Sequence, residues 1–323
     1  MNAWDAGNGG SGGRHTAERH LDLAATRLLA PLDGSRLAEA VLPVVETLAI
    51  AGATPVLLHV RERGAPATIH GERHLRAADE ASAYLAGVAD RLRTTGRAVE
   101  RHTHDVPEGD VARSIAAHAE EVRAGMIVLC THGGGGVRDL LVGSIAQQVL
   151  RRGTVPVLLV RPDAAGGPTA FAPGAVLVPL DGTAAAEAAL SPAADLARAL
   201  GARLHLVMVV ATLQTVRGDR QPGAHLLPAT ARALLDQQQD DAQAYLDALA
   251  TTLRPTSLTV TTEVRRGDAA AALSDEAAEP GVGLVVAATH GRAGLQAVWA
   301  GSVTARLLAR TRAPVLLLRT IDH

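Results

Sequence analysis

The chain has 323 residues, which at roughly 150 residues per domain favours two domains, and its formal net charge of −2 gives no electrostatic basis for binding nucleic acids. It holds a single cysteine, Cys130, so it cannot form an intramolecular disulfide, and it holds no lysine, which excludes a Walker A phosphate loop and a Schiff base. No uncharged apolar run approaches the ~18 residues of a membrane span, and residues 1–20 lack the apolar segment of a secretory signal, so the sequence predicts a soluble cytoplasmic protein without a membrane partner.

Apolar strands alternate with helical segments along the first half of the chain. Residues 1–22 are rich in glycine and polar side chains, which predicts a disordered tail. Strands are predicted at Arg27–Leu32, Pro55–Val60, Ala98–Asp105, Met126–Cys130 and Pro156–Val160. Helices are predicted at Leu37–Ile50, Glu72–Arg93, Asp110–Val122 and Ser144–Arg151, with Asp110 as an N-cap.

The second half repeats this order. Its predicted strands include Ala175–Leu180, Leu204–Val210 and Gly283–Ala288. We therefore expect one domain at 23–162 and another at 174–321, joined by a linker at 163–173 that is rich in Gly, Pro and Ala. Matching positions are 148 residues apart early in the repeat and 158 apart later, so the second half holds an insertion, which the match of Tyr84 to Tyr245 places near 211–235. This insertion is either a lid over a second pocket or a surface loop.

One motif occurs twice, 158 residues apart. Thr131-His132-Gly133 is followed by Gly143-Ser144, and Thr289-His290-Gly291 is followed by Gly301-Ser302. Each motif lies after an apolar strand and before a helix, where backbone N–H groups and a helix N-terminus can hold a phosphate. The duplicated loop predicts two copies of one nucleotide-sized binding unit.

The alternation of strands and helices predicts an α/β fold with two open, mostly parallel sheets that helices cover on both faces. Ligands in such folds bind outside the carboxyl ends of the strands, and three residues of each half end predicted strands: Asp33, Val60 and Cys130, then Asp181, Val209 and Ala288. At that edge the two aspartates either accept hydrogen bonds from a ribose or an adenine, or serve only to close a turn before glycine.

In this order, these motifs resemble the universal stress protein family in a tandem form, over residues 26–161 and 175–319. The resemblance rests on Ala-Pro-Leu-Asp-Gly-Ser at 30–35, Val-Pro-Leu-Asp-Gly-Thr at 178–183, Leu-Leu-His-Val at 57–60 and the two glycine loops. It implies two adenine nucleotide alpha hydrolase-like domains with strand order 3-2-1-4-5. It also implies that Val157–Val160 pairs with Val315–Leu318, giving a pseudo-dimer within the chain, and it leaves open a further dimer of two chains.

The resemblance implies an adenine-nucleotide site in each half, for ATP, AMP or ADP, with Mg²⁺ arriving on the ATP. The family pattern Gly-x2-Gly-x9-Gly-Ser/Thr is complete here except for its first glycine, which Cys130 and Ala288 replace. Arg292 can pair with a phosphate, so we expect the second half to bind more tightly. The candidate nucleotide-binding residues are Pro31, Asp33, Val60, Cys130, Gly133, Gly143, Ser144 and Ile145 in the first half, and Pro179, Asp181, Val209, Ala288, Gly291, Arg292, Gly301, Ser302 and Val303 in the second.

Three functions fit these patterns. The favoured one is a non-enzymatic stress-response protein that binds ATP, with no catalytic residue assigned. The second is an interaction scaffold without nucleotide, which the replacements at Cys130 and Ala288 motivate. The third is a slow ATPase, or a protein that phosphorylates itself at Ser144 or Ser302.

Two further features are interpreted as structural. His102 and His104 have a spacing that could chelate a metal, but the second half has Leu258–Thr262 at the matching place. A solvated strand face is therefore favoured, and no metal site is assigned. Cys130 is interpreted as a small residue at a strand end rather than as a redox sensor.

Overall fold

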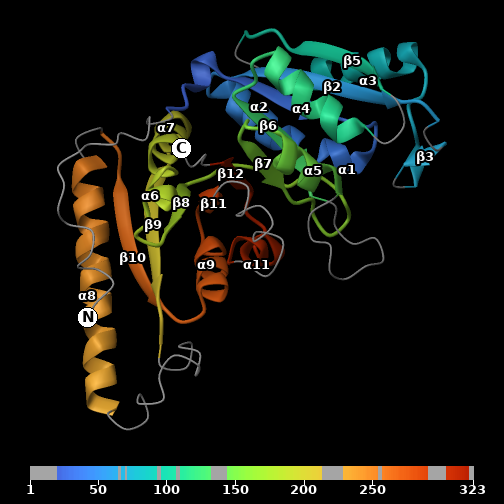
Figure 1. Cartoon of the computed structure of the whole chain (residues 1–323). Coiled ribbons are helices and arrows are strands. Elements are labelled where there is room, and N and C mark those ends of the chain that lie inside the picture. The colour runs from blue at the N-terminus through green and yellow to red at the C-terminus, as the bar shows by residue number, and fades with distance from the viewer. Residues whose placement is uncertain are drawn as a thin grey trace.

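The computed structural model describes residues 20–64, 67–69, 71–92, 96–106, 110–131, 144–212, 228–253, 257–289 and 303–319. Within these residues the chain forms an α/β structure in which one sheet of ten strands runs through both halves (Figure 1). None of the helices in the described ranges is both long and apolar enough to cross a membrane.

The first half supplies five strands of the large sheet and a small hairpin. The strands of the large sheet are β1 (Arg27–Pro31), β2 (Thr54–Glu62), β5 (Glu100–Val106), β6 (Met126–Cys130) and β7 (Val157–Val160). The hairpin is formed by β3 (Thr68–Ile69) and β4 (Glu72–Arg73). The helices are η1 (Leu23–Ala25), α1 (Arg36–Glu39), α2 (Leu42–Ile50), α3 (Ala78–Arg91), α4 (Val111–Glu121) and α5 (Ser144–Arg152).

The second half repeats the arrangement. Its strands are β8 (Ala175–Leu180), β9 (Arg203–Val210), β10 (Val260–Arg266), β11 (Val282–Thr289) and β12 (Val315–Arg319). Its helices are α6 (Ala184–Glu187), α7 (Leu190–Leu200), α8 (Pro228–Leu253), α9 (Ala269–Ala277) and α11 (Val303–Arg310).

The sheet order is β10-β9-β8-β11-β12-β7-β6-β1-β2-β5. In the large sheet each half thus has the predicted strand order 3-2-1-4-5, and its strand pairs within a half are all parallel. The two halves meet at an antiparallel pair in which Leu316 of β12 lies opposite Leu158 of β7. The predicted pairing of the last strands within one chain is therefore confirmed.

Two arginines at matching positions tie this junction together. Arg161 donates hydrogen bonds to the carbonyls of Ala309 and Thr311, and Arg319 donates one to the carbonyl of Gly153, 3.1 Å away. These carbonyls lie at the carboxyl ends of α11 and α5, where a positive charge is favourable. The repeat therefore places the same cation on both sides of a pseudo-twofold junction.

Apolar strand residues are buried because helices cover both faces of the sheet. One face packs against α2, α3, α7 and α8, where Leu28 and Val176 are fully buried. The other face packs against α4, α5, α9 and α11, around Leu29 and Val285. Each core is continuous across the junction because β7 and β12 join the sheets.

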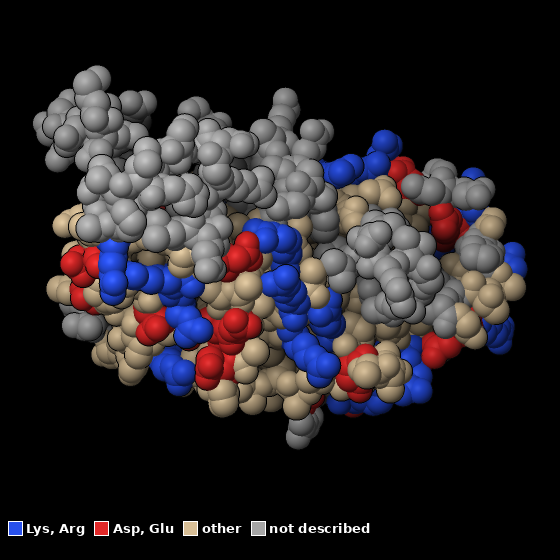
Figure 2. Space-filling view, turned by 90° about the horizontal axis from the view of Figure 1, so that it is seen from below, with Lys and Arg blue, Asp and Glu red and all other residues tan. Residues whose placement is uncertain are grey.

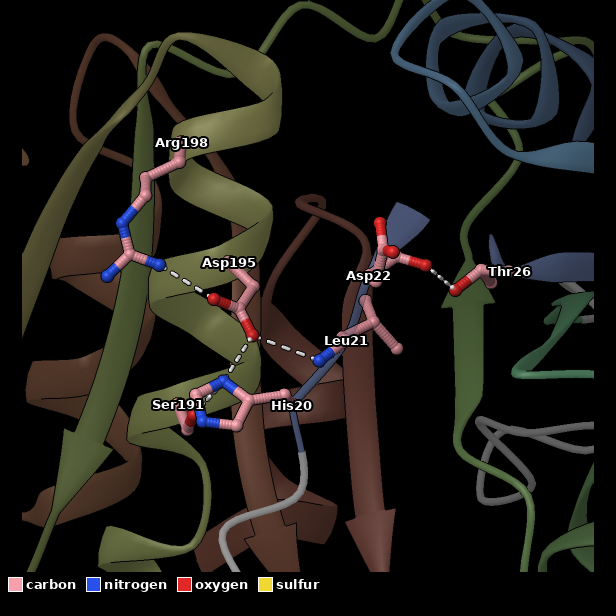
Figure 3. Close-up of polar contacts among 7 residues, drawn as sticks. All are labelled: His20, Leu21, Asp22, Thr26, Ser191, Asp195 and Arg198. Carbon is pink, nitrogen blue, oxygen red and sulfur yellow. Dashed lines mark hydrogen bonds and ion pairs between the residues drawn. The ribbon is translucent and has the colours of Figure 1, made fainter. Parts of the chain in front are cut away.

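The start of the described chain reaches across to the second half (Figure 3). The side chain of Asp195 on α7 accepts hydrogen bonds from the Leu21 amide at 2.9 Å and from Arg198 at 2.6 Å. The His20 ring lies 3.1 Å from the same carboxylate and 3.0 Å from the Ser191 hydroxyl. Residues 20–22, which we expected in the disordered tail, instead dock on α7, and Leu21 is buried in the core.

Three predicted helical features differ from the structure. Helix 37–50 is split into α1 and α2 because Pro43, in the first turn of α2, has no N–H to continue the preceding helix. Helix 72–93 begins only at Ala78, since β3 and β4 form a hairpin around Gly71, whose φ is +81°. Asp110 is the N-cap residue of α4 as predicted, but its side chain makes no capping hydrogen bond; its carboxylate pairs with Arg113 and Arg152 instead.

The insertion in the second half includes a helical extension. Residues 213–227 lie outside the described residues, but α8 is 26 residues long, whereas its counterpart α3 has 14. Figure 1 shows α8 beside β10 at the outer edge of the second half. Arg266 of β10 contacts Asp236 and Gln239 in the amino-terminal part of α8, so the extension is held to the strand end.

Candidate functional site

Two matching turns follow the first strand of each half. The Oδ1 atom of Asp33 accepts hydrogen bonds from the Ser35 amide at 2.9 Å and from its hydroxyl at 2.6 Å. Asp181 does the same with Thr183, at 3.0 Å and 2.6 Å. Both aspartates therefore close the turn, which was one of the two roles considered for them.

The residues that these aspartates hold are helix caps. Ser35 Oγ accepts from the Ala38 amide and caps α1, and Thr183 Oγ1 accepts from the Ala186 amide and caps α6. In each half the strand is therefore followed by an aspartate whose side chain is held in place, and then by the N-terminus of a short helix. In both halves the turn places a negatively charged acceptor at the carboxyl edge of the sheet.

The residue that replaces the first glycine of the loop pattern lies at the end of the strand beside each turn: Cys130 is the last residue of β6, and Ala288 is the second-last residue of β11. Because β1 lies between β2 and β6, and β8 between β9 and β11, these strand ends share one edge in each half. Cys130 and Ala288 are half-buried and pack against the core on the face that α2, α3, α7 and α8 cover. Burial and, to a lesser extent, the nearby Asp33 carboxylate raise the pKa of the Cys130 thiol to about 12.

The remaining predicted site residues divide into those the structure describes and those it does not. Pro31 and Pro179 are half-buried near the ends of β1 and β8, Val60 is buried in β2, and Val209 is half-buried in β9. Ile145 and Val303 lie in the first turns of α5 and α11. The glycine loops fall outside the described residues, and with them Gly133, Gly143, Gly291, Arg292, Gly301 and Ser302; for Ser144 only its place at the start of α5 is described.

Two tyrosines that we had used only to align the repeat belong to this edge. The Tyr245 hydroxyl donates a 2.7 Å hydrogen bond to Glu187 of α6, and burial, this bond and the nearby Asp181 raise its pKa. The pKa of Tyr84 is raised as well: burial is the largest cause, and the nearby Glu39 and Asp33 carboxylates add smaller contributions. The sequence could have indicated a shared role for these residues, since the chain has only 2 tyrosines and they lie at matching positions of the repeat.

The edge of the first half is covered by a segment that has no described counterpart in the second. His59 is fully buried in β2; its Nδ1 lies 2.7 Å from the Leu32 carbonyl and its Nε2 3.2 Å from the Leu75 carbonyl. A Cβ at Gly34 would lie 2.8 Å from Leu75 Cδ1. The segment after the β3–β4 hairpin therefore packs directly on the turn that follows β1.

The turn of the second half is less covered. Met208 takes the place of His59, and a Cβ at Gly182 would meet only Met208 Cε, at 3.9 Å, among the described residues. Both glycines need their positive φ, +90° at Gly34 and +81° at Gly182. Among the described residues, the turn after β8 is less crowded than the turn after β1.

Charged side chains are mixed on the surface that Figure 2 shows. A short band of basic residues is flanked by acidic ones, in keeping with the net charge of −2. Since the chain has no lysine, these basic residues are all arginines.

Comparisons with known proteins agree with this geometry. The model of the universal stress protein family matches residues 25–161 and 174–319. The fold is similar to a universal stress protein from Archaeoglobus fulgidus, with a TM-score of 0.62 and 17% identity over 92% of this chain and 97% of that one. The fold is also similar to a functionally unknown protein from Pseudomonas aeruginosa, with a TM-score of 0.59 and 18% identity over 92% of this chain and 94% of that one. The cytoplasmic domain of a prokaryotic cation chloride cotransporter is similar with a TM-score of 0.51 and 13% identity, over 90% of this chain and 94% of that one. No protein with a curated description matches the sequence.

Proposed function

Because the chain belongs to the universal stress protein family, we propose that it binds an adenine nucleotide, ATP foremost, at the carboxyl edge of the sheet in each half. The nucleotide acts as a ligand that stabilises or switches the protein, and Mg²⁺ arrives with the triphosphate. The observation that supports this most is the duplicated turn: Asp33 and Asp181 are held in the same way beside strand ends that lead into the two glycine loops.

The second half is proposed as the tighter site. Its turn is less covered than that of the first half, where Leu75 packs on Gly34. Arg292 in the loop sequence adds a cation that can pair with a phosphate. In this view the first half has a weaker site, or serves mainly as the pseudo-symmetric partner of the second.

Substitution of each aspartate by asparagine separates a ligand role from a turn role. Asparagine keeps a side-chain oxygen that can accept from Ser35 or Thr183, so the turn survives while the charge is lost. We expect Asp181→Asn to weaken ATP binding in calorimetry with little change in melting temperature, and Asp33→Asn to have a smaller effect. If both variants bind ATP as tightly as the parent chain, the aspartates act only in the turns.

Mass spectrometry of the purified full-length chain tests the proposed function itself. Co-purified ATP or AMP supports the proposal, and Gly143→Glu together with Gly301→Glu should abolish it by filling the space for phosphates. Absence of any bound nucleotide, together with no thermal stabilisation by added ATP, would favour the scaffold. ADP together with a phosphoserine at Ser144 or Ser302 would instead indicate slow turnover.

A further inference from the structure

A cluster of histidines lies between β5 and α4 of the first half. β5 is an edge strand in which half-buried and exposed residues alternate, and His102 and His104 are both on the half-buried side. The centre of the His118 ring on α4 is 4.2 Å from that of His104 and 4.8 Å from that of His102. The strand face that we had expected to be solvated is therefore packed against a third histidine.

His118 is the buried member of this cluster. Only 1% of its surface is exposed, and its Nδ1 lies 3.0 Å from a carboxylate oxygen of Glu121. Its Nε2 is also buried but has no hydrogen-bond partner among the described residues. A buried polar atom without a partner is costly, so the described contacts leave this imidazole only partly satisfied.

The second half fills the same place with charged groups, although Glu276 Oε2 is also buried there without a hydrogen bond among the described residues. His104 lies opposite Val60 in the sheet, as Arg265 lies opposite Val209, and α9 carries Glu276 where α4 carries His118. Arg265 pairs with Glu276 at 3.3 Å. Both ring nitrogens of the neighbouring His205 have partners, Thr261 Oγ1 and Glu276 Oε1. The first half has imidazoles where the second has an ion pair.

We propose that His104, His118 and Glu121 bind a divalent transition metal, with Zn²⁺ as the best match. Two imidazoles and a carboxylate are a zinc ligand set. Nδ1 of His118 and the Glu121 oxygen already lie 3.0 Å apart, close to the spacing of two ligands of one ion, so Zn²⁺ takes the place of the proton between them. In this arrangement the ion joins the edge strand β5 to α4.

The geometry needs only a small adjustment. The ligand atoms of His104, His118 and Glu121 lie within 4.8 Å of one another. Tetrahedral Zn²⁺ with bonds of 2.0–2.1 Å holds its ligands about 3.4 Å apart. The Glu121 side chain is 68% exposed and can move inward.

The test uses the tag-free full-length chain, stripped with EDTA and titrated with Zn²⁺ by calorimetry and against a chromophoric chelator. We expect one Zn²⁺ per chain and, on substitution with Co²⁺, a visible absorption spectrum of tetrahedral type. His104→Ala, on the partly exposed edge strand, should lower the affinity about 100-fold or more, and Glu121→Gln about 10- to 100-fold.

His205→Gln is the matched control, because this histidine is buried but already bonded at both nitrogens, and it should leave Zn²⁺ binding unchanged. His118→Gln should abolish binding, with circular dichroism to check the fold; His104→Ala keeps the test valid if that variant unfolds. Absence of stoichiometric Zn²⁺ binding would overturn the proposal. So would binding that persists in His104→Ala, or that falls equally in His205→Gln.

Discussion

Replacing Gly34 or Gly182 by alanine tests whether the Leu75 segment covers the first site. The two glycines occupy matching turns and have similar positive φ angles, +90° and +81°. They differ in their surroundings, since the new Cβ would lie 2.8 Å from Leu75 Cδ1 in the first half but 3.9 Å from Met208 Cε in the second. The pair therefore separates backbone strain from steric overlap.

The expected magnitudes follow from these distances. An L-residue in a left-handed conformation costs roughly 1–2 kcal/mol, which both variants should lose. Gly34→Ala adds overpacking against Leu75, which costs about 1–3 kcal/mol more. We therefore expect a loss of about 2–5 kcal/mol for Gly34→Ala and about 1–2 kcal/mol for Gly182→Ala.

Urea unfolding followed by circular dichroism measures both losses. The double variant Gly34→Ala, Leu75→Ala should lose less than the sum of the two single variants, because truncating Leu75 removes the overlap. Equal losses at the two glycines, or strict additivity in this double-mutant cycle, would refute the proposed cover over the first turn.

Three further variants or treatments have defined outcomes. With a pKa of about 12, Cys130 should be thiolate in only about one chain in 10,000 at pH 8, so iodoacetamide labelling followed by mass spectrometry should rise about tenfold per pH unit up to pH 10; a plateau by pH 9 would contradict this. Tyr245→Phe should cost about 1–3 kcal/mol in urea unfolding because it removes a 2.7 Å hydrogen bond to a carboxylate. Tyr84→Phe should cost less, because the nearby Glu39 raises the pKa of Tyr84 but its contact with the hydroxyl does not reach normal hydrogen-bond geometry; the reverse order would be inconsistent with these contacts. Asp195→Asn should speed hydrogen exchange at the Leu21 amide by weakening the acceptor that holds it, and unchanged protection there would exclude the docking on α7.

The residues themselves determined the repeat and most of the strands. Apolar runs such as Ala175–Leu180 and Met126–Cys130 form strands with the predicted bounds, because a strand buried on both faces leaves a continuous apolar signal. The strand order and the pairing of β7 with β12 followed from the resemblance and are confirmed. At the site, the sequence predicted which strand ends would share an edge.

Contacts between distant residues decided the rest. The β3–β4 hairpin replaces a predicted helix where the following residues contact His59 and Gly34, some 15–40 positions away in the chain. Residues 20–22 are docked because Asp195 accepts from Leu21, 174 positions further along. His102 and His104 looked solvated because nothing in the strand's alternation reveals that His118 packs on it. Local periodicity reports which face of an element is buried, but only the tertiary structure shows what that face contacts.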